Sequence, residues 1–400
     1  MKNSTLATVF ALSPLLGIYS VGVPLLSLSQ LLLLIILSIC YFKYKGRFES
    51  YFLIYIVYAI FITIFNFIIT SWTIIGDGIH DILSLLLFFF TLLGVSNFAD
   101  YNKFKKTLLG FGLVSLVFFF LQYGLNIIGV QLAGIIPFLP LANEENTADM
   151  IAHKLESERT SGLFLEPAHY ADFMIIILVF LLFKEKMTKK DIFIALAIIA
   201  SILLCHSATG YVMMAIILAY WVFVYHLKKS KYKILFLSIA LTLASALVVF
   251  ISTNESMMEV FGRYNELTGD SGDSVHGYSS FIRVVRGYIP FAESDLFYQI
   301  FGSGLGSLIG YVNSHPQSSY LALTTFNPKW INGLQYLIFS TGIIGAIIYF
   351  TQLYKIGKKS SVLGRAFIVV LIMLFLSADS FFSQEMILYI IVQEKMFKLA

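Results

Sequence analysis

The chain has 400 residues, of which 58% are hydrophobic and 12% are charged, and its formal net charge at pH 7 is +4. A soluble protein of this composition would leave large apolar areas in contact with water, and the small net charge does not indicate nucleic-acid binding, so both classes are excluded. Runs of about 20 residues with almost no charge recur along the chain, which predicts an all-α polytopic membrane protein.

These apolar runs predict about twelve transmembrane helices in a single integral membrane domain, residues 1–400. In chain order, the expected spans are roughly 5–20, 22–42, 51–70, 80–97, 107–130, 168–184, 191–205, 210–227, 234–251, 334–353, 362–379 and 381–397. Pro14, Gly22 and Pro24 lie where the first two spans need a tight turn. The N-terminus has one lysine before an apolar run and no clear cleavage site, so we expect an uncleaved first helix instead of a signal peptide.

The basic residues predict how the helices are oriented. With the N-terminus in the cytoplasm, every inner loop is basic, which is the positive-inside pattern. The basic residues on the outer side are then Lys154, Arg159, Arg263, Arg283, Arg286 and Lys329. This arrangement predicts that both termini are cytoplasmic and that two long loops are extracytoplasmic, a smaller one at 131–167 and a large one at 252–333.

The smaller loop ends in several polar and charged residues where the chain enters the membrane again. Arg159 could bind a phosphate oxygen through paired hydrogen bonds. Glu166 at the membrane rim could act as a general base, and Pro167 suits the first position of a helix. The alternative is an ordinary helix start, in which Glu166 lies near the positive helix end and Arg159 pairs with a neighbouring glutamate.

The large loop carries further candidates. Arg283 and Arg286 are three residues apart, so they would share a helix face, and two fixed cations beside a membrane suit a lipid diphosphate. The alternative is a basic face in contact with water or headgroups. His315 could take the proton of a sugar hydroxyl near neutral pH, although most single loop histidines are only solvated. The glycines of 301–307 lack the βαβ unit of a dinucleotide site, so they predict close approach of the backbone to another segment or a ligand.

The expected spans contain few ionisable residues, which argues against ion-coupled transport. Asp77, His80 and Asp81 are near a predicted outer end, and the deeper polar residues Gln122 and Asn126 are uncharged. Ion-coupled transporters usually need carboxylates or histidines near the middle of the membrane. No metal-ligand spacing or nucleophile motif occurs, so we expect no metal site.

Several motifs, taken in order, resemble the O-antigen polymerase (Wzy) family, within the superfamily that includes the O-antigen ligases. They are RTSGLFLEPAHYA at 159–171, HSATGY at 206–211, SSFIR at 279–283, FGSGLGS at 301–307, NSHPQSSYL at 313–321 and TGIIG at 341–345. Twelve spans with one dominant outer loop also match this family. The chain departs from the pattern at Pro316, where related sequences often have Asn or another polar residue.

The resemblance implies a GT-C-like glycosyltransferase of the bacterial cytoplasmic (inner) membrane that needs no nucleotide sugar, metal or other cofactor. Such enzymes transfer a growing glycan from undecaprenyl diphosphate to a new lipid-linked repeat unit, with inversion of the anomeric centre. Carried over by position, Arg159 and Arg283 would bind the diphosphate, with Arg286 as the weaker third candidate. His315 or Glu166 would activate the acceptor hydroxyl.

The sequence therefore predicts a polymerase of O-antigen or capsular polysaccharide repeat units. Its partners would be the undecaprenyl-diphosphate-linked oligosaccharide and membrane lipid, with a chain-length regulator and a flippase as further candidates and no nucleic acid. The nearest alternative is an O-antigen ligase, which shares the donor chemistry and differs in the acceptor. An alternative of another class is a lipid-linked oligosaccharide flippase or exporter, which would place its cations in a central cavity. A non-catalytic scaffold is the most distant alternative.

Overall fold

The computed structural model describes residues 3–22, 27–43, 52–70, 75–132, 134, 160–227, 286–315, 331–377 and 385–397. Across these ranges the chain is helical and contains no β-strand; a single isolated antiparallel bridge joins Ser20 and Ser27. The chain forms two compact units. Unit 1 comprises residues 1–2, 37–99 and 265–400, and unit 2 comprises residues 3–36 and 100–264.

Among the described residues, three helices are long and apolar enough to cross a membrane: α5 (Ile75–Phe98), α6 (Tyr101–Ile127) and α18 (Gly333–Lys358). Shorter apolar helices are found at Leu28–Lys43, Leu53–Ile69, Pro167–Leu182, Ala208–Val224 and Val362–Ser377. These helices confirm the prediction of an all-α membrane protein. The number of twelve spans, the single membrane domain and the arrangement of the loops stay predictions, and the expected span at 234–251 lies outside the described residues.

The prediction of one continuous helix over residues 5–20 is wrong, because this segment forms two short helices, α1 (Ser4–Ala11) and α2 (Ser13–Leu16). Pro14 has no backbone N–H to donate and cannot continue the hydrogen bonding of α1. The Ser13 hydroxyl donates to the Phe10 carbonyl (2.8 Å), at the point where α1 ends. The segment packs on α6 within unit 2, since the rings of Phe10 and Phe104 have centroids 5.5 Å apart.

The remainder of unit 2 is a group of apolar helices. It consists of α6, α8 (Pro167–Leu182), α9 (Lys189–Leu204), α10 (Ala208–Trp221) and the π-helical turn η1 (Val222–Leu227), and α3 (Leu28–Lys43) begins in this unit. α8 and α10 run side by side in the same direction. At their starts, the Cys205 thiol, just before α10, donates to the Pro167 carbonyl (3.8 Å), and at their ends the Trp221 indole donates to the Leu182 carbonyl (2.8 Å).

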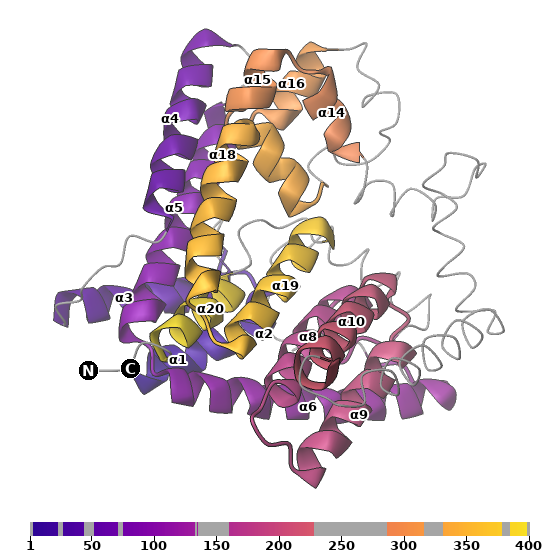
Figure 1. Cartoon of the computed structure of the whole chain (residues 1–400). Coiled ribbons are helices and arrows are strands. Elements are labelled where there is room, and N and C mark those ends of the chain that lie inside the picture. The colour runs from indigo at the N-terminus through magenta and orange to yellow at the C-terminus, as the bar shows by residue number, and fades with distance from the viewer. Residues whose placement is uncertain are drawn as a thin grey trace. The chain divides into compact units, whose positions relative to one another are not determined.

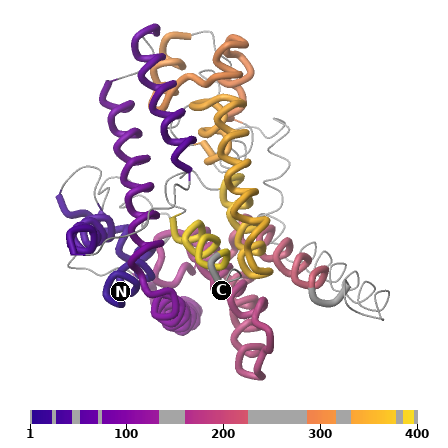
Figure 2. The backbone as a smooth tube through the Cα atoms, turned by 60° about the vertical axis from the view of Figure 1, so that its left-hand side comes forward, coloured from indigo at the N-terminus to yellow at the C-terminus, as the bar shows by residue number. Residues whose placement is uncertain are grey.

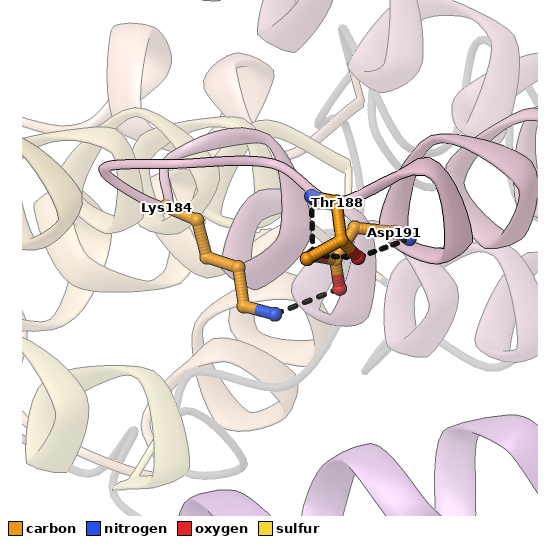
Figure 3. Close-up of polar contacts among 3 residues, drawn as sticks. All are labelled: Lys184, Thr188 and Asp191. Carbon is orange, nitrogen blue, oxygen red and sulfur yellow. Dashed lines mark hydrogen bonds and ion pairs between the residues drawn. The ribbon is translucent and has the colours of Figure 1, made fainter.

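A capped turn joins α8 to α9 at the basic end of unit 2 (Figure 3). Lys184 Nζ lies 2.7 Å from Asp191 Oδ1, and Asp191 Oδ2 accepts from the Thr188 backbone N–H (2.9 Å) and hydroxyl (2.8 Å). The Thr188 hydroxyl oxygen accepts in return from the Asp191 N–H (3.2 Å), which completes a capping box. This turn lies at the opposite ends of α8 and α9 from residues 160–167.

In the described part of unit 1 there are five helices of 13 to 26 residues and three short helices of six or seven residues. Its elements are α4 (Leu53–Ile69), α5, α14 (Tyr288–Glu293), α15 (Leu296–Phe301), α16 (Leu308–Ser314), α18, α19 (Val362–Ser377) and α20 (Glu385–Phe397). Figure 2 shows the indigo-to-purple helices α4 and α5 alongside the yellow-orange α18. The short helices α14 and α15 contact α18, and α14 also contacts α16 (Figure 1).

α18 is broken at Gly342, whose backbone is non-helical (φ 65°, ψ −175°). The break is filled by the glycine-rich segment after α15. Ser303 N–H donates to the Phe339 carbonyl (3.0 Å), and Gly304 N–H donates to the Ser340 carbonyl (2.9 Å). Carbonyls at a helix break in an apolar environment need such partners, because an unpaired carbonyl there is costly.

The same glycine-rich segment is also bound to α4. The Asn66 amide donates to the Gly302 carbonyl (2.9 Å), and the Leu305 N–H donates to the Thr63 hydroxyl (2.9 Å). At Gly306 (φ +72°) an added Cβ would lie 2.5 Å from the backbone of α5. The expectation that these glycines allow close backbone approach is therefore confirmed.

Candidate functional site

Arg286, one of the candidate residues of unit 1, lies beside the first turn of α18. Asn332 caps this turn: its side-chain oxygen accepts from the Gln335 N–H (2.8 Å), and the Gln335 side-chain oxygen accepts from the Asn332 N–H (3.1 Å). Gln335 is fully buried against Gly287, where an added Cβ would lie 2.6 Å from its Oε1 atom. The capping box therefore fixes the backbone beside Arg286.

Arg286 lies just before α14 and is fully buried. Removing a guanidinium from water costs several kcal/mol unless other groups compensate its charge. A lipid diphosphate could reach this side chain only if the groups that cover it moved. The structure thus places Arg286 as part of the framework near the site, and its contact with a ligand stays a prediction.

His315 follows the last residue of α16, and its ring stacks on Tyr311 with centroids 4.2 Å apart. Its Nδ1 atom is 2.8 Å from the Tyr311 carbonyl oxygen. A carbonyl only accepts, so the neutral ring carries its proton on Nδ1 and its basic lone pair on Nε2. Burial, with smaller contributions from Glu293 and Asp295, raises the pKa of Tyr311 to about 12, so its hydroxyl stays protonated at neutral pH.

A chain of hydrogen bonds connects α5, the glycine-rich segment and α18. The Tyr336 hydroxyl donates to Asp81 Oδ2, and Asp81 Oδ1 is 2.8 Å from His80 Nδ1. The Gly306 N–H in turn donates to the Tyr336 oxygen (3.2 Å). The side chain of His80 is 48% exposed and that of Asp81 is 19% exposed, so this series of hydrogen bonds ends at an accessible imidazole.

In unit 2, two uncharged side chains of α6 hold the turn that follows Arg159 in the chain. The Gln122 side chain accepts from the Gly162 N–H (2.8 Å) and donates to the Leu132 carbonyl. One helical turn further on, the Asn126 amide donates to the Thr160 hydroxyl (3.2 Å). The two amides therefore set the path of the chain towards α8.

Glu166 is the N-cap residue of α8, and Pro167 is the first residue of that helix, as the sequence predicted. The Glu166 side chain makes no capping hydrogen bond and is half-buried. The HSATG turn lies beside this helix start, since an added Cβ at Gly210 would be 2.5 Å from the Ala171 Cβ atom. Two motifs that are separate in the sequence thus meet at one end of unit 2.

Three of the five predicted site residues can therefore be placed. Arg286 and His315 belong to unit 1, and Glu166 belongs to unit 2. Arg159 and Arg283 lie outside the described residues, as do large parts of both predicted outer loops. Within the described ranges, no group of three His, Cys, Asp or Glu side chains could hold a metal ion.

The role of the polar residues near the helix ends was not predicted from the sequence. Asn66, Gln122 and Asn126 each bind a segment distant in the chain, and Tyr336 binds Asp81. A signal was present, because a polar side chain within an apolar run needs a partner in the membrane. The identity of that partner could not be read from the sequence.

Comparison with known proteins gives one family. A family model described as WcaD colanic acid polymerase matches residues 5–396 of the chain. No curated protein sequence matches the chain.

Proposed function

The chain belongs to the WcaD colanic acid polymerase family, and from this premise we propose that it joins lipid-linked oligosaccharide repeat units into a polysaccharide. The match confirms the resemblance to the O-antigen polymerase superfamily and supports a glycosyltransferase-type enzyme in a membrane. The observation that carries the proposal is that this match spans nearly the whole chain, so it covers both units and both predicted loops.

The donor is a growing glycan on undecaprenyl diphosphate, and the acceptor is a new lipid-linked repeat unit. A hydroxyl oxygen of the acceptor attacks the anomeric carbon of the donor. The bond from this carbon to the diphosphate oxygen breaks, and its electron pair leaves with the lipid diphosphate. Attack from the side opposite the leaving group inverts the anomeric centre.

Cations and a base have separate tasks in this reaction. Arg159 and Arg283 bind the diphosphate and neutralise the charge that develops as it leaves. Arg286, which is buried beside the first turn of α18, would contact the diphosphate only after local opening. His315, with its basic lone pair on Nε2, or Glu166, at the start of α8, accepts the proton of the acceptor hydroxyl.

The enzyme works at the outer face of the bacterial inner membrane, with both termini in the cytoplasm. Its substrate is supplied from the cytoplasmic side by a flippase, and a chain-length regulator limits the product. The family name favours an exported polysaccharide of the colanic acid kind over O antigen. The positive-inside pattern supports the proposed orientation, and membership of a polymerase family supports a lipid-linked substrate.

Purified protein incubated with lipid-diphosphate-linked repeat units alone tests the proposal. We expect a ladder of longer lipid-linked glycans, resolved by gel electrophoresis or mass spectrometry. Product that forms only after a glycolipid core is added would instead identify a ligase. Donor that stays chemically unchanged in both reactions, yet crosses the membrane of a reconstituted vesicle, would identify an exporter.

A further inference from the structure

The hydrogen-bond chain runs from the glycine-rich segment through Tyr336 and Asp81 to His80. The Gly306 N–H can only donate, so it occupies an acceptor position of the Tyr336 oxygen (3.2 Å). The Tyr336 hydroxyl proton then goes to Asp81 Oδ2. An ionised carboxylate only accepts, so at Asp81 Oδ1 the donor is the His80 Nδ1–H (2.8 Å).

The tautomer of His80 follows from this direction. With the proton on Nδ1, the basic lone pair of the neutral imidazole is on Nε2. The side chain is 48% exposed, so a substrate hydroxyl could reach it. When Nε2 takes a proton, the ring becomes a cation, and the adjacent Asp81 carboxylate stabilises that cation.

Backbone packing fixes the position of Gly306, whose N–H is the first donor of this series of hydrogen bonds. At Gly306 an added Cβ would lie 2.5 Å from backbone atoms of Asp77 and Gly78, so the loop lies directly on α5 one turn before Asp81. The Leu305 N–H bond to Thr63 holds the preceding residue on α4. The N–H that fixes Tyr336 is therefore positioned by two helices.

The histidine of the large loop is oriented by a weaker partner. His315 Nδ1 faces the Tyr311 backbone carbonyl, which is neutral, whereas His80 Nδ1 faces a carboxylate. A charged hydrogen-bond partner favours the imidazolium more than a neutral partner does. Of the two histidines, His80 is thus the one whose Nδ1–H is oriented by a carboxylate, as in a His–Asp pair.

We propose that His80 is the catalytic base that accepts the proton of the acceptor hydroxyl, and that Asp81 and Tyr336 are its positioning residues. The proposal rests on the proposed glycosyltransferase function and assigns to His80 the proton transfer for which His315 and Glu166 were the candidates. As the acceptor oxygen bonds to the anomeric carbon, its proton moves to His80 Nε2. The electron pair of the broken bond leaves with the lipid diphosphate, and His80 later releases the proton to water.

The test uses the full-length protein reconstituted with lipid-diphosphate-linked repeat units. We expect His80→Gln to lower kcat about 100- to 10,000-fold, which is the usual contribution of a general base, with little change in the KM for the acceptor. Exogenous imidazole should restore part of the activity of His80→Ala. Asp81→Asn should lower kcat to a smaller extent, and Tyr336→Phe about tenfold, the loss typical of one hydrogen bond to a charged group.

Tyr354→Phe is the matched control, because Tyr354 is an exposed tyrosine near the other end of α18. It should keep the wild-type rate. Wild-type rates in both His80→Gln and His80→Ala would overturn the proposal. A raised KM with unchanged kcat, or lost activity that imidazole does not restore in protein with the wild-type melting temperature, would also overturn it. Failure of the wild-type protein itself to extend the donor would instead contradict the proposed function.

Discussion

Different interactions stabilise the polar end of unit 1 and the polar end of unit 2, each within its own unit. In unit 2 the turn after Arg159 is held by two neutral amides, Gln122 and Asn126. In unit 1 ionisable groups belong to the framework itself, with Arg286 fully buried and Asp81 bonded to Tyr336. Neutral amides are less costly to bury than charges, so the turn in unit 2 is held without a buried ion.

This difference separates two kinds of mutational effect. A change in the framework of unit 1 should alter stability and chemistry together, because the same groups serve both. A change in a surface charge of unit 2 should alter chemistry alone. Four sets of variants test this contrast, beginning with the largest expected effect.

Arg159→Ala and Arg283→Ala should each abolish long glycan chains, because each removes a cation that neutralises the leaving diphosphate. Loss of one such stabilising group typically lowers the rate about 100- to 1,000-fold. Membrane insertion and the melting temperature should stay unchanged. Gel profiles of the lipid-linked product give the chain lengths, and a normal chain-length distribution in both variants would contradict the diphosphate assignment.

Gly342→Ala should destabilise unit 1 by about 2–4 kcal/mol, through strain at a positive φ and overpacking. The added Cβ would lie 2.4 Å from the Ile300 carbonyl oxygen. Thermal unfolding in detergent measures the effect.

Gly110→Ala on α6 is the control for this variant, since nothing lies within 4 Å of a Cβ at that position. It should be neutral or stabilising by up to about 1 kcal/mol, because alanine favours a helix more than glycine. Equal stability of the two variants would show that the helix break does not depend on Gly342.

Gln122→Leu should destabilise unit 2 by about 1–3 kcal/mol, because it leaves the Gly162 N–H and the Leu132 carbonyl without their partner. Polymerisation should fall as well, since the turn after Arg159 loses its support. Asn102→Leu, at an exposed position in the first turn of α6, is the control. Wild-type melting temperature and activity in Gln122→Leu would argue against an anchoring role for this amide.

His315→Ala and Glu166→Gln should have the smallest effects, each at most about tenfold in kcat, if His80 is the base. Initial rates of chain extension measure both. A loss of 100-fold or more in one of them, with His80→Gln active, would assign the proton transfer to that residue.

Much of the helical structure could be predicted from the sequence. The runs that became α4, α5, α6, α8 and α19 each contain a long uncharged stretch, with any charged residues near one end. Such stretches have few alternatives to a helix in a membrane. The close packing of the 301–307 glycines was also predicted, because residues without a side chain allow the backbone to approach another segment closely.

Two features could not be predicted, for identifiable reasons. The break between α1 and α2 depends on Pro14 in a segment whose hydropathy alone would fit one span. The site contacts join residues far apart in the chain, such as Asn66 to Gly302 and Asp81 to Tyr336. Hydropathy shows that such polar side chains need partners, but only the fold shows which partners they have.

The most direct test of the central claim is the stoichiometry of the reaction of the purified wild-type protein with lipid-linked repeat units alone. We predict that one undecaprenyl diphosphate is released for each new glycosidic bond, measured by lipid extraction and by mass spectrometry of the glycan. Movement of intact donor across a vesicle membrane, with no diphosphate released and no bond formed, would contradict the assignment of this chain as a polymerase.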